Sequence, residues 1–213
     1  MSELVLCKLC GERRAKRACP AVKGDICSIC CGTEREVSLA CPIGCEYLRE
    51  AHRHEKSLPV DPKEVSDPDI DVSEHFVRSH EELLLFCVYS LVQAALRTAG
   101  AVDTDVLVAL EALIKTYRTT EAGLLYETRP ENTLAASVQR AFSDSLADYQ
   151  KVKDEKESDT PATNAEILTM LVFLRRIGQQ NQNGRPRGRM YIDMLSHMTP
   201  NAGVDERAPS IIL

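Results

Sequence analysis

Eight of the nine cysteines in this chain lie between positions 7 and 45. A segment of this size, with few large apolar side chains, cannot bury enough surface to fold on hydrophobic contacts alone. The eight residues are Cys7, Cys10, Cys19, Cys27, Cys30, Cys31, Cys41 and Cys45. Clustered thiolates are preferred ligands of structural zinc, and a Cys-x2-Cys pair presents two sulfurs to one ion from a single turn. Eight thiolates fill two closed tetrahedral shells, so the sequence predicts two zinc ions in this segment.

The metal would supply most of the folding energy of this segment. Structural zinc contributes about 10 kcal/mol or more per ion in small domains. Gly11 and Gly32 directly follow Cys10 and Cys31, and we expect both glycines to adopt the positive φ that tight knuckles require.

Disulfides, free thiols, iron–sulfur ligation and redox catalysis are the competing interpretations of the cysteines. The sequence from Met1 to Cys7 lacks the basic segment and apolar core of a signal peptide, so we expect a cytoplasmic chain with reduced thiols. The compact cysteine run of cluster ferredoxins is absent. Catalysis by Cys7 and Cys10, or by Cys27 and Cys30, would need a thioredoxin-like βαβ unit, for which the sequence shows no pattern.

The spacing from Cys7 to Cys30, with 2, 8, 7 and 2 residues between successive cysteines, resembles that of B-box zinc fingers and their MYND-like relatives. Those modules hold two metal ions in a cross-brace, in which ligand pairs of the two sites alternate along the chain. The resemblance implies that one zinc is bound by Cys7, Cys10, Cys27 and Cys30, and the second by Cys19, Cys31, Cys41 and Cys45. Cys30 and Cys31 could exchange sites. The resemblance also implies binding to proteins rather than catalysis.

Two features depart from the B-box pattern. Val22 stands where a B-box usually has an acidic or cysteine ligand, and Cys41 and Cys45 replace its closing histidines. The resemblance covers only about 40 of the 213 residues. The rest of the sequence carries no further family resemblance, and the chain as a whole looks like a bacterial protein.

Composition divides the chain into four parts. A cysteine-rich module covers residues 1–56 and ends in a short helix begun by Cys45. A linker at 57–70 is rich in proline and acidic residues. A helical domain follows at 71–198, and a flexible tail at 199–213 closes the chain. We therefore predict a small zinc-stabilised cross-brace module with two zinc ions, followed by an all-α domain of five or six packed helices.

Periodicity and capping signals place the helices of the second domain. A capping box at Asp71–Glu74 or Ser79–Glu82 begins a first helix that ends near Gly100. Its uncharged run of 14 residues, from Leu83 to Leu96, is too short to span a bilayer. A second helix is expected at 104–119, and a short apolar helix at 123–126. Three further helices are expected: from Thr133 to about Tyr149, from the Thr163–Glu166 capping box to Gly178, and at 187–198.

The formal net charge of −6 speaks against a chain that coats nucleic acid through bulk charge. One stretch, from Ile167 to Ile192, nevertheless has no acidic residue before Asp193 and contains Arg175, Arg176, Arg185, Arg187 and Arg189. These arginines could contact RNA or DNA. The simpler interpretation is that Arg175 and Arg176 interact favourably with the C-terminus of a helix, and that the other arginines keep the following loop soluble. Cations of the cysteine-rich module raise the same question: Lys8, Arg13, Arg14, Lys16 and Arg17.

The other titratable residues have simpler interpretations. Cys87 lies within an apolar helix, where we expect a core residue. His52 and His54 follow the cysteines and could ligate zinc, but eight thiolates suffice, so we expect both to face solvent. Surface or packing roles are expected for the remaining histidines, which are His75, His80 and His197.

These observations favour a cytoplasmic, non-enzymatic zinc protein whose module binds another protein or holds the helical domain in place. Shells filled by four thiolates leave no open position for water or substrate. The sequence contains no glycine-rich phosphate loop and no Ser/His/Asp arrangement. Binding of RNA or DNA through the arginine-rich segments is the alternative hypothesis.

Overall fold

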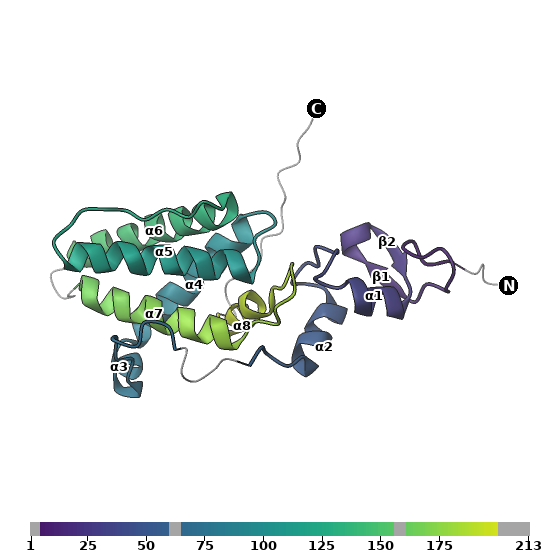
Figure 1. Ribbon diagram of the computed structural model, residues 1–213, viewed down its shortest axis with the longest axis horizontal. Coiled ribbons are helices and arrows are strands. Elements are labelled where there is room, and N and C mark those ends of the chain that lie inside the picture. Colours follow the sequence, from purple (N-terminus) through teal and green to yellow (C-terminus); the bar gives the residue numbers. More distant parts are fainter. Residues whose placement is uncertain (1–4, 60–64, 156–160, 200–213) are drawn as a thin grey trace, which may run out of the picture.

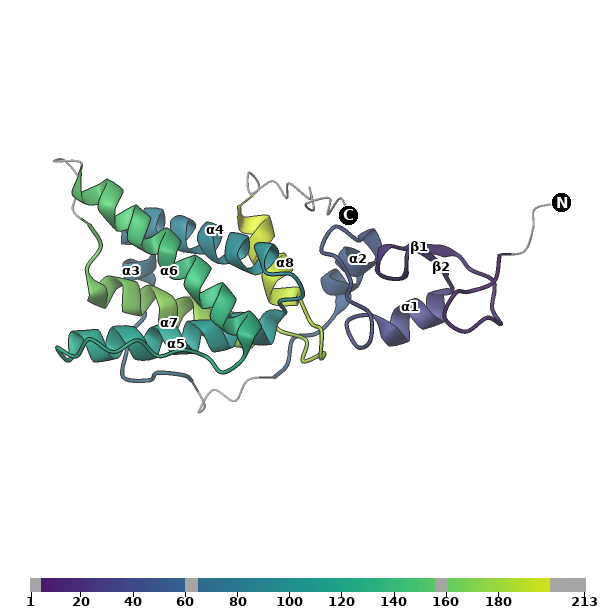
Figure 2. The ribbon, with the colours of Figure 1, turned by 90° about the horizontal axis from the view of Figure 1, so that it is seen from above.

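A computed structural model of the chain describes residues 5–59, 65–155 and 161–199. The cysteine-rich module lies at one end of an elongated molecule, and the helical domain forms the other end (Figures 1 and 2). Apart from Thr199, the expected flexible tail lies outside the described residues, as does part of the expected linker. Within the described ranges, no helix combines the length and apolar character needed to cross a membrane.

The cysteine-rich module contains one small hairpin and two short helices. Strand β1 (Arg17–Cys19) pairs antiparallel with β2 (Gly24–Ile26) through a 3₁₀ turn at Pro20–Val22. Helix α1 (Ser28–Glu34) follows directly, and α2 (Glu46–His54) has Cys45 at its N-cap position, which confirms the predicted helix begun by this cysteine. The core of the module consists largely of cysteines, packed with Ile26, Leu39 and Leu48.

The helical domain contains six helices in the described part of the chain. They are α3 (Glu74–Ser79), α4 (Glu81–Arg97), α5 (Asp103–Glu121), α6 (Thr133–Asp154), α7 (Asn164–Gln180) and α8 (Met190–Met198). The predicted first helix is divided into α3 and α4, and Ser73 caps α3 by accepting a hydrogen bond from the Phe76 amide. The predicted capping box at α7 is confirmed, with Thr163 and Glu166 each bonding to the backbone amide of the other.

Residues 122–132, which connect α5 to α6, run back along the length of α5 (Figure 1). The Thr128 amide donates to Thr116 Oγ1 at 2.9 Å, and Asn132 Nδ2 donates to Asp105 Oδ1 at 2.7 Å. Helices α5 and α6 therefore point in the same direction, which excludes a tight turn between them.

The predicted short helix at 123–126 is wrong, because this segment has no regular structure and is exposed to solvent. The physical reason is distance. The connection must cover the stretch of α5 between Glu121 and Asp105, which is about 24 Å at the helical rise of about 1.5 Å per residue. Eleven extended residues reach about 36 Å, whereas the same residues in a helix would reach only about 16 Å.

Helix α8 lies across the end of the bundle and is held by buried polar contacts. The carboxylate of Asp103 accepts hydrogen bonds from the amides of Tyr191 and Ile192, at 2.9 and 3.1 Å. Burial raises the pKa of Asp103 to about 7 in spite of these two amides, which lower it. The buried Tyr191 ring reaches into the core, where its hydroxyl donates to the carbonyl of Leu174 at 2.8 Å.

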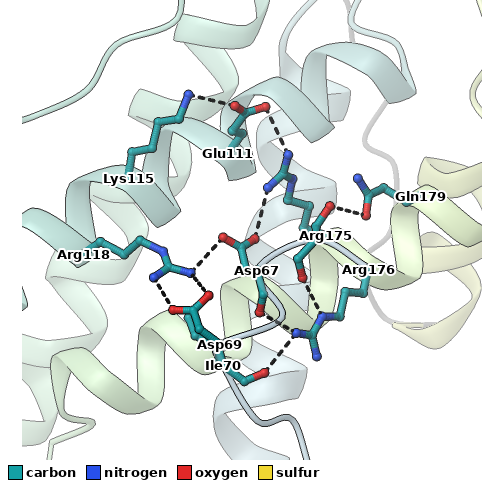
Figure 3. Close-up of polar contacts among 10 residues, drawn as sticks. Asp67, Asp69, Ile70, Glu111, Lys115, Arg118, Arg175, Arg176 and Gln179 are labelled. Carbon is teal, nitrogen blue, oxygen red and sulfur yellow. Dashed lines mark hydrogen bonds and ion pairs between the residues drawn. The ribbon is translucent and has the colours of Figure 1, made fainter. Parts of the chain in front are cut away.

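The second half of the expected linker is bound to α5 and α7 by an ion network (Figure 3). Arg118 on α5 pairs with Asp69 at 2.6 Å and with Asp67 at 3.0 Å, and the hydrogen bond from Arg118 lowers the pKa of Asp69 to about 2. Arg175 on α7 also pairs with Asp67, at 3.1 Å. Arg176 donates to backbone carbonyls of the same segment, at Ser66, Asp67 and Ile70.

Replacing Gly178 tests the packing of α8. A Cβ at this position would lie 2.7 Å from the Tyr191 ring and 2.7 Å from Leu107 Cδ2. We expect Gly178→Ala to lower the free energy of unfolding by about 1–2 kcal/mol, because overpacking outweighs the gain in helix propensity. The control is Gly32→Ala in α1, where no atom lies within 4 Å of an added Cβ. Urea unfolding should show the control to be neutral or stabilised; equal effects of both substitutions would contradict the packing argument.

Candidate metal centre

Four cysteine sulfurs come together in the cysteine-rich module. The sulfurs of Cys7, Cys10, Cys27 and Cys30 all lie within 4.8 Å of one another, and the group could hold one metal ion. In a tetrahedral site with zinc–sulfur bonds of about 2.3 Å, the sulfurs are about 3.8 Å apart, so modest contraction would complete the shell. Four thiolates form a closed shell with no open coordination position.

Two local structures present these sulfurs. A turn brings Cys7 and Cys10 together, closed by a 2.8 Å hydrogen bond from the Gly11 amide to the Cys7 carbonyl. Gly11 has φ +67°, as predicted, and only glycine adopts this conformation without strain. Cys27 is the N-cap of α1, and its sulfur accepts the amide of Cys30 at 3.3 Å. The expectation of a positive φ at Gly32 is wrong, because Gly32 lies within α1.

Hydrogen bonds to sulfur favour the thiolate form in part of this group. Burial opposes ionisation of Cys7, but amides of Cys10, Cys27 and Leu9 outweigh it and lower its pKa to about 6. The amide of Cys30 likewise lowers the pKa of Cys27. The contact with Cys27, together with burial, raises the pKa of Cys30 to about 12, so this thiol keeps its proton. A metal ion bound by all four thiolates would displace the proton of Cys30.

The other four clustered cysteines line one small pocket. Cys19 comes from the end of β1, Cys31 from α1, Cys41 from the loop that follows, and Cys45 from the start of α2. Their sulfurs do not form a group within 4.8 Å among the described residues. Burial raises the pKa of Cys41; the Glu36 amide opposes this rise, and the negative charges of Glu36, Cys45 and Cys19 reinforce it. Of the two cysteines that could exchange sites, Cys30 lies in the first group and Cys31 lines the pocket.

The expectation that His52 faces solvent is wrong. This side chain is buried, with Nδ1 2.8 Å from Asp193 Oδ2 on α8 and Nε2 3.1 Å from Glu36 Oε2. Burial lowers the pKa of His52, but the two carboxylates outweigh it and raise the value to about 9. His54, by contrast, is exposed and lies 3.1 Å from Glu50, as expected of a surface residue. No local sequence pattern marks His52, because its partners are distant along the chain.

Three of the five arginines considered for nucleic-acid binding use their guanidinium groups inside the molecule. Arg175 pairs with Asp67 and Glu111, and Arg176 donates to backbone carbonyls. Arg185 pairs with Glu55 at 2.7 Å. The other two differ: the Arg189 amide donates to Glu36, and the Arg187 side chain is exposed.

Some cationic side chains of the cysteine-rich module likewise have partners within the molecule, whereas others are exposed to solvent. Arg13 contacts the Cys27 sulfur, Lys8 donates to the Val22 and Lys23 carbonyls, and Arg17 lies over the Tyr47 ring. The side chains of Arg14 and Lys16 are exposed.

The remaining residues singled out in the sequence have structural roles. Cys87 is fully buried, as predicted, and burial raises its pKa to about 12. His80 stacks on Phe76 and lies 3.0 Å from Glu166, whereas His75 is exposed. His197 is also largely exposed, with Nδ1 2.7 Å from the Asp193 carbonyl oxygen.

The pKa of His52 predicts a pH-dependent contribution to stability. A histidine whose pKa rises from 6.5 to about 9 on folding stabilises fully below pH 6.5, and the contribution is lost as the pH rises to 9. The gap in unfolding free energy between the wild type and His52→Gln should therefore shrink by about 2–3 kcal/mol between pH 6 and pH 9.5. Chemical denaturation at both pH values measures it, with the exposed His54→Gln as control. A gap that stays constant would show that His52 is neutral in the folded protein.

Three comparisons with known proteins bear on identity. No family model, no curated protein and no solved structure matches the chain. Its function therefore has to be argued from the geometry of the site.

Proposed function

We propose that this chain is a non-enzymatic zinc protein whose cysteine-rich module binds another protein. The observation that carries the proposal is the contrast between the ligands, of which Cys7, Cys27 and Cys30 are buried and Cys10 is partly buried, and their exposed neighbours. Leu9 and Ile29 lie between the cysteines of the two Cys-x2-Cys pairs, yet they are 40% and 54% exposed. The metal site would thus serve to present aliphatic side chains to solvent, which suits binding rather than catalysis.

The proposal includes two zinc ions in a B-box-like cross-brace. The four sulfurs of Cys7, Cys10, Cys27 and Cys30 support the first site. The second site would use Cys19, Cys31, Cys41 and Cys45, which line one pocket and offer four thiols, the donor set that structural zinc prefers. Ligands of the two sites alternate along the chain, as a cross-brace requires.

The partner should combine apolar and acidic surface. Val5 and Leu6, which precede the first ligand, are also exposed aliphatic residues. The exposed side chains of Arg14 and Lys16 lie on the segment that pairs with them, through a bridge between Leu6 and Arg14. This end of the module points away from the helical domain (Figure 2), so a partner could approach without contacting the bundle.

Nucleic-acid binding is the weaker proposal. Phosphate contacts need free guanidinium groups, and three of the five arginines between 175 and 189 are already occupied by internal partners. The exposed Arg14, Lys16 and Arg187 leave a smaller cationic surface.

Metal content tests the zinc sites. We expect about two zinc ions per chain, and about one in the Cys10→Ser variant, because loss of one thiolate opens only the first shell. Elemental analysis combined with thiol counting gives both numbers. A purified chain that contained iron, or that showed all eight clustered thiols freely reactive, would disprove the zinc proposal.

Substitution of the exposed aliphatic residues tests partner binding. The double variant Leu9→Ser and Ile29→Ser should keep its metal. The amount of partner that co-purifies with it from the native cell should fall at least tenfold, because the apolar contact is removed. The matched control is Leu125→Ser, since this side chain is 98% exposed on the α5–α6 connection. Each sample is scored with and without nuclease. Equal recovery by both variants would argue against this surface, and loss of the partner on nuclease treatment would favour nucleic-acid binding.

A further inference from the structure

Glu36 is the most unusual residue in the contact between the module and the helical domain. It is a charged residue with 0% exposure, and its φ of +52° lies in the left-handed region that non-glycine residues rarely adopt. It belongs to the loop between α1 and Cys41. A conformation of this kind persists only where surrounding contacts hold it.

The side chain and carbonyl of Glu36 bind the loop between α7 and α8. Oε1 accepts the Arg189 amide at 2.7 Å, and Oε2 accepts Asn183 Nδ2 at 2.8 Å. The Glu36 carbonyl accepts the Arg187 amide at 2.8 Å. One buried residue of the module therefore fixes three positions of the loop at residues 181–189.

The same stretch of backbone contacts two cysteines of the proposed second zinc site. The Glu36 amide donates to the Cys41 sulfur. The guanidinium of the preceding residue, Arg35, donates to the Cys31 sulfur at 3.8 Å, and the Arg35 carbonyl accepts Arg185 Nη1 at 2.8 Å. Residues 35 and 36 thus contact the thiols on one side and the α7–α8 loop on the other.

Helix α2 makes a second connection between the same two places. Its N-cap is Cys45, another proposed ligand, and two turns later it carries His52. His52 lies between Glu36 and Asp193 of α8, so it joins the two connections. Figure 1 shows α2 beside α8 at the junction of the two parts.

This cluster is an unsuitable third metal site. Oxygens of Glu36 and Glu55 and a nitrogen of His52 do lie within 4.8 Å of one another. Each carboxylate oxygen, however, already accepts a hydrogen bond: Glu36 from Asn183 and the Arg189 amide, and Glu55 from Asn183 and Arg185. The carboxylate oxygens of Glu36 and Glu55 are thus satisfied by protein donors, as expected of a structural contact.

We infer that metal binding at Cys19, Cys31, Cys41 and Cys45 locks the cysteine-rich module onto the α7–α8 loop. The inference rests on the proposed second zinc site and adds its regulatory role. With the thiolates bound to metal, Cys41 and Cys45 hold Glu36 and His52 in place. Loss of that ion frees both residues and loosens the loop and the start of α8, while the bundle core stays folded.

The experiment compares two ligand variants of the full-length chain, Cys45→Ser and Cys10→Ser. Serine at position 45 keeps a good N-cap for α2, and the hydrogen bonds of Glu36 described above involve neither Cys45 nor Cys10. Native mass spectrometry counts metal ions, and amide hydrogen exchange follows peptides covering 181–192 and 106–114. We expect one ion in each variant. Exchange in 181–192 should rise at least tenfold in Cys45→Ser and stay within twofold of wild type in Cys10→Ser, with 106–114 protected throughout.

Two results would overturn the inference in distinguishable ways. A wild-type chain with a single metal ion would remove the second site itself, and the proposed two-zinc module with it. If the wild type holds two ions and Cys45→Ser holds one, but 181–192 keeps wild-type protection, the lock fails while the two-zinc module stands.

Glu36→Gln provides a second measurement that needs no ligand variant to fold. Coupling between two sites is reciprocal, so a weaker contact between Glu36 and the loop must lower the affinity of the second site for its metal ion. We expect this variant to exchange faster in 181–192 and to lose its second ion to a chelator at least fivefold more readily than wild type, with the first ion unchanged. Faster exchange in 181–192 combined with wild-type retention of the second ion would refute the lock.

Discussion

The need to bring thiol sulfurs together determines the architecture of the first quarter of this protein. Among its described residues, the module buries few hydrocarbon side chains besides Ile26, Leu39 and Leu48, and cysteines make up most of its core. Packed thiolates repel one another unless protons or cations neutralise them. Protons are unevenly shared in the first group, where Cys7 favours the thiolate and Cys30 the thiol. The stability of such a core therefore depends on pH and on metal concentration, whereas the stability of an aliphatic core does not depend on them directly.

The cysteine cluster and most of the helices could be predicted because their signals are local. The resemblance to B-box fingers implied that Cys7, Cys10, Cys27 and Cys30 form one group, as the structure places them, and the α7 capping box lies where the Thr163–Glu166 sequence places it. Periodicity alone does not distinguish a short helix from an apolar connection, so residues 123–126 were misassigned. The boundary between α3 and α4 was missed for a related reason, since both halves carry helical patterns and only the backbone at His80 separates them.

The buried polar contacts could not be predicted, because their partners are far apart in sequence. His52 is 16 residues from Glu36 and 141 from Asp193, and each of the three would be read locally as a surface residue. The acidic linker illustrates the same problem, because Asp67 and Asp69 are suited to solvent until α5 and α7 bring arginines beside them. Charge pairing between residues distant in sequence therefore gives these hydrophilic residues a role in stabilising the tertiary structure.

The extended connection between α5 and α6 has a consequence for how the chain reaches this structure. Helices joined by a short turn can dock as soon as both exist, but parallel α5 and α6 cannot form such a local hairpin. Helix α5 packs extensively against α7, which lies beyond the whole of α6 in sequence. Contacts between distant segments require large loops to close early, and proteins rich in them fold more slowly. This bundle should therefore assemble more slowly than an up-and-down bundle of equal length, with α5 waiting for the last third of the chain.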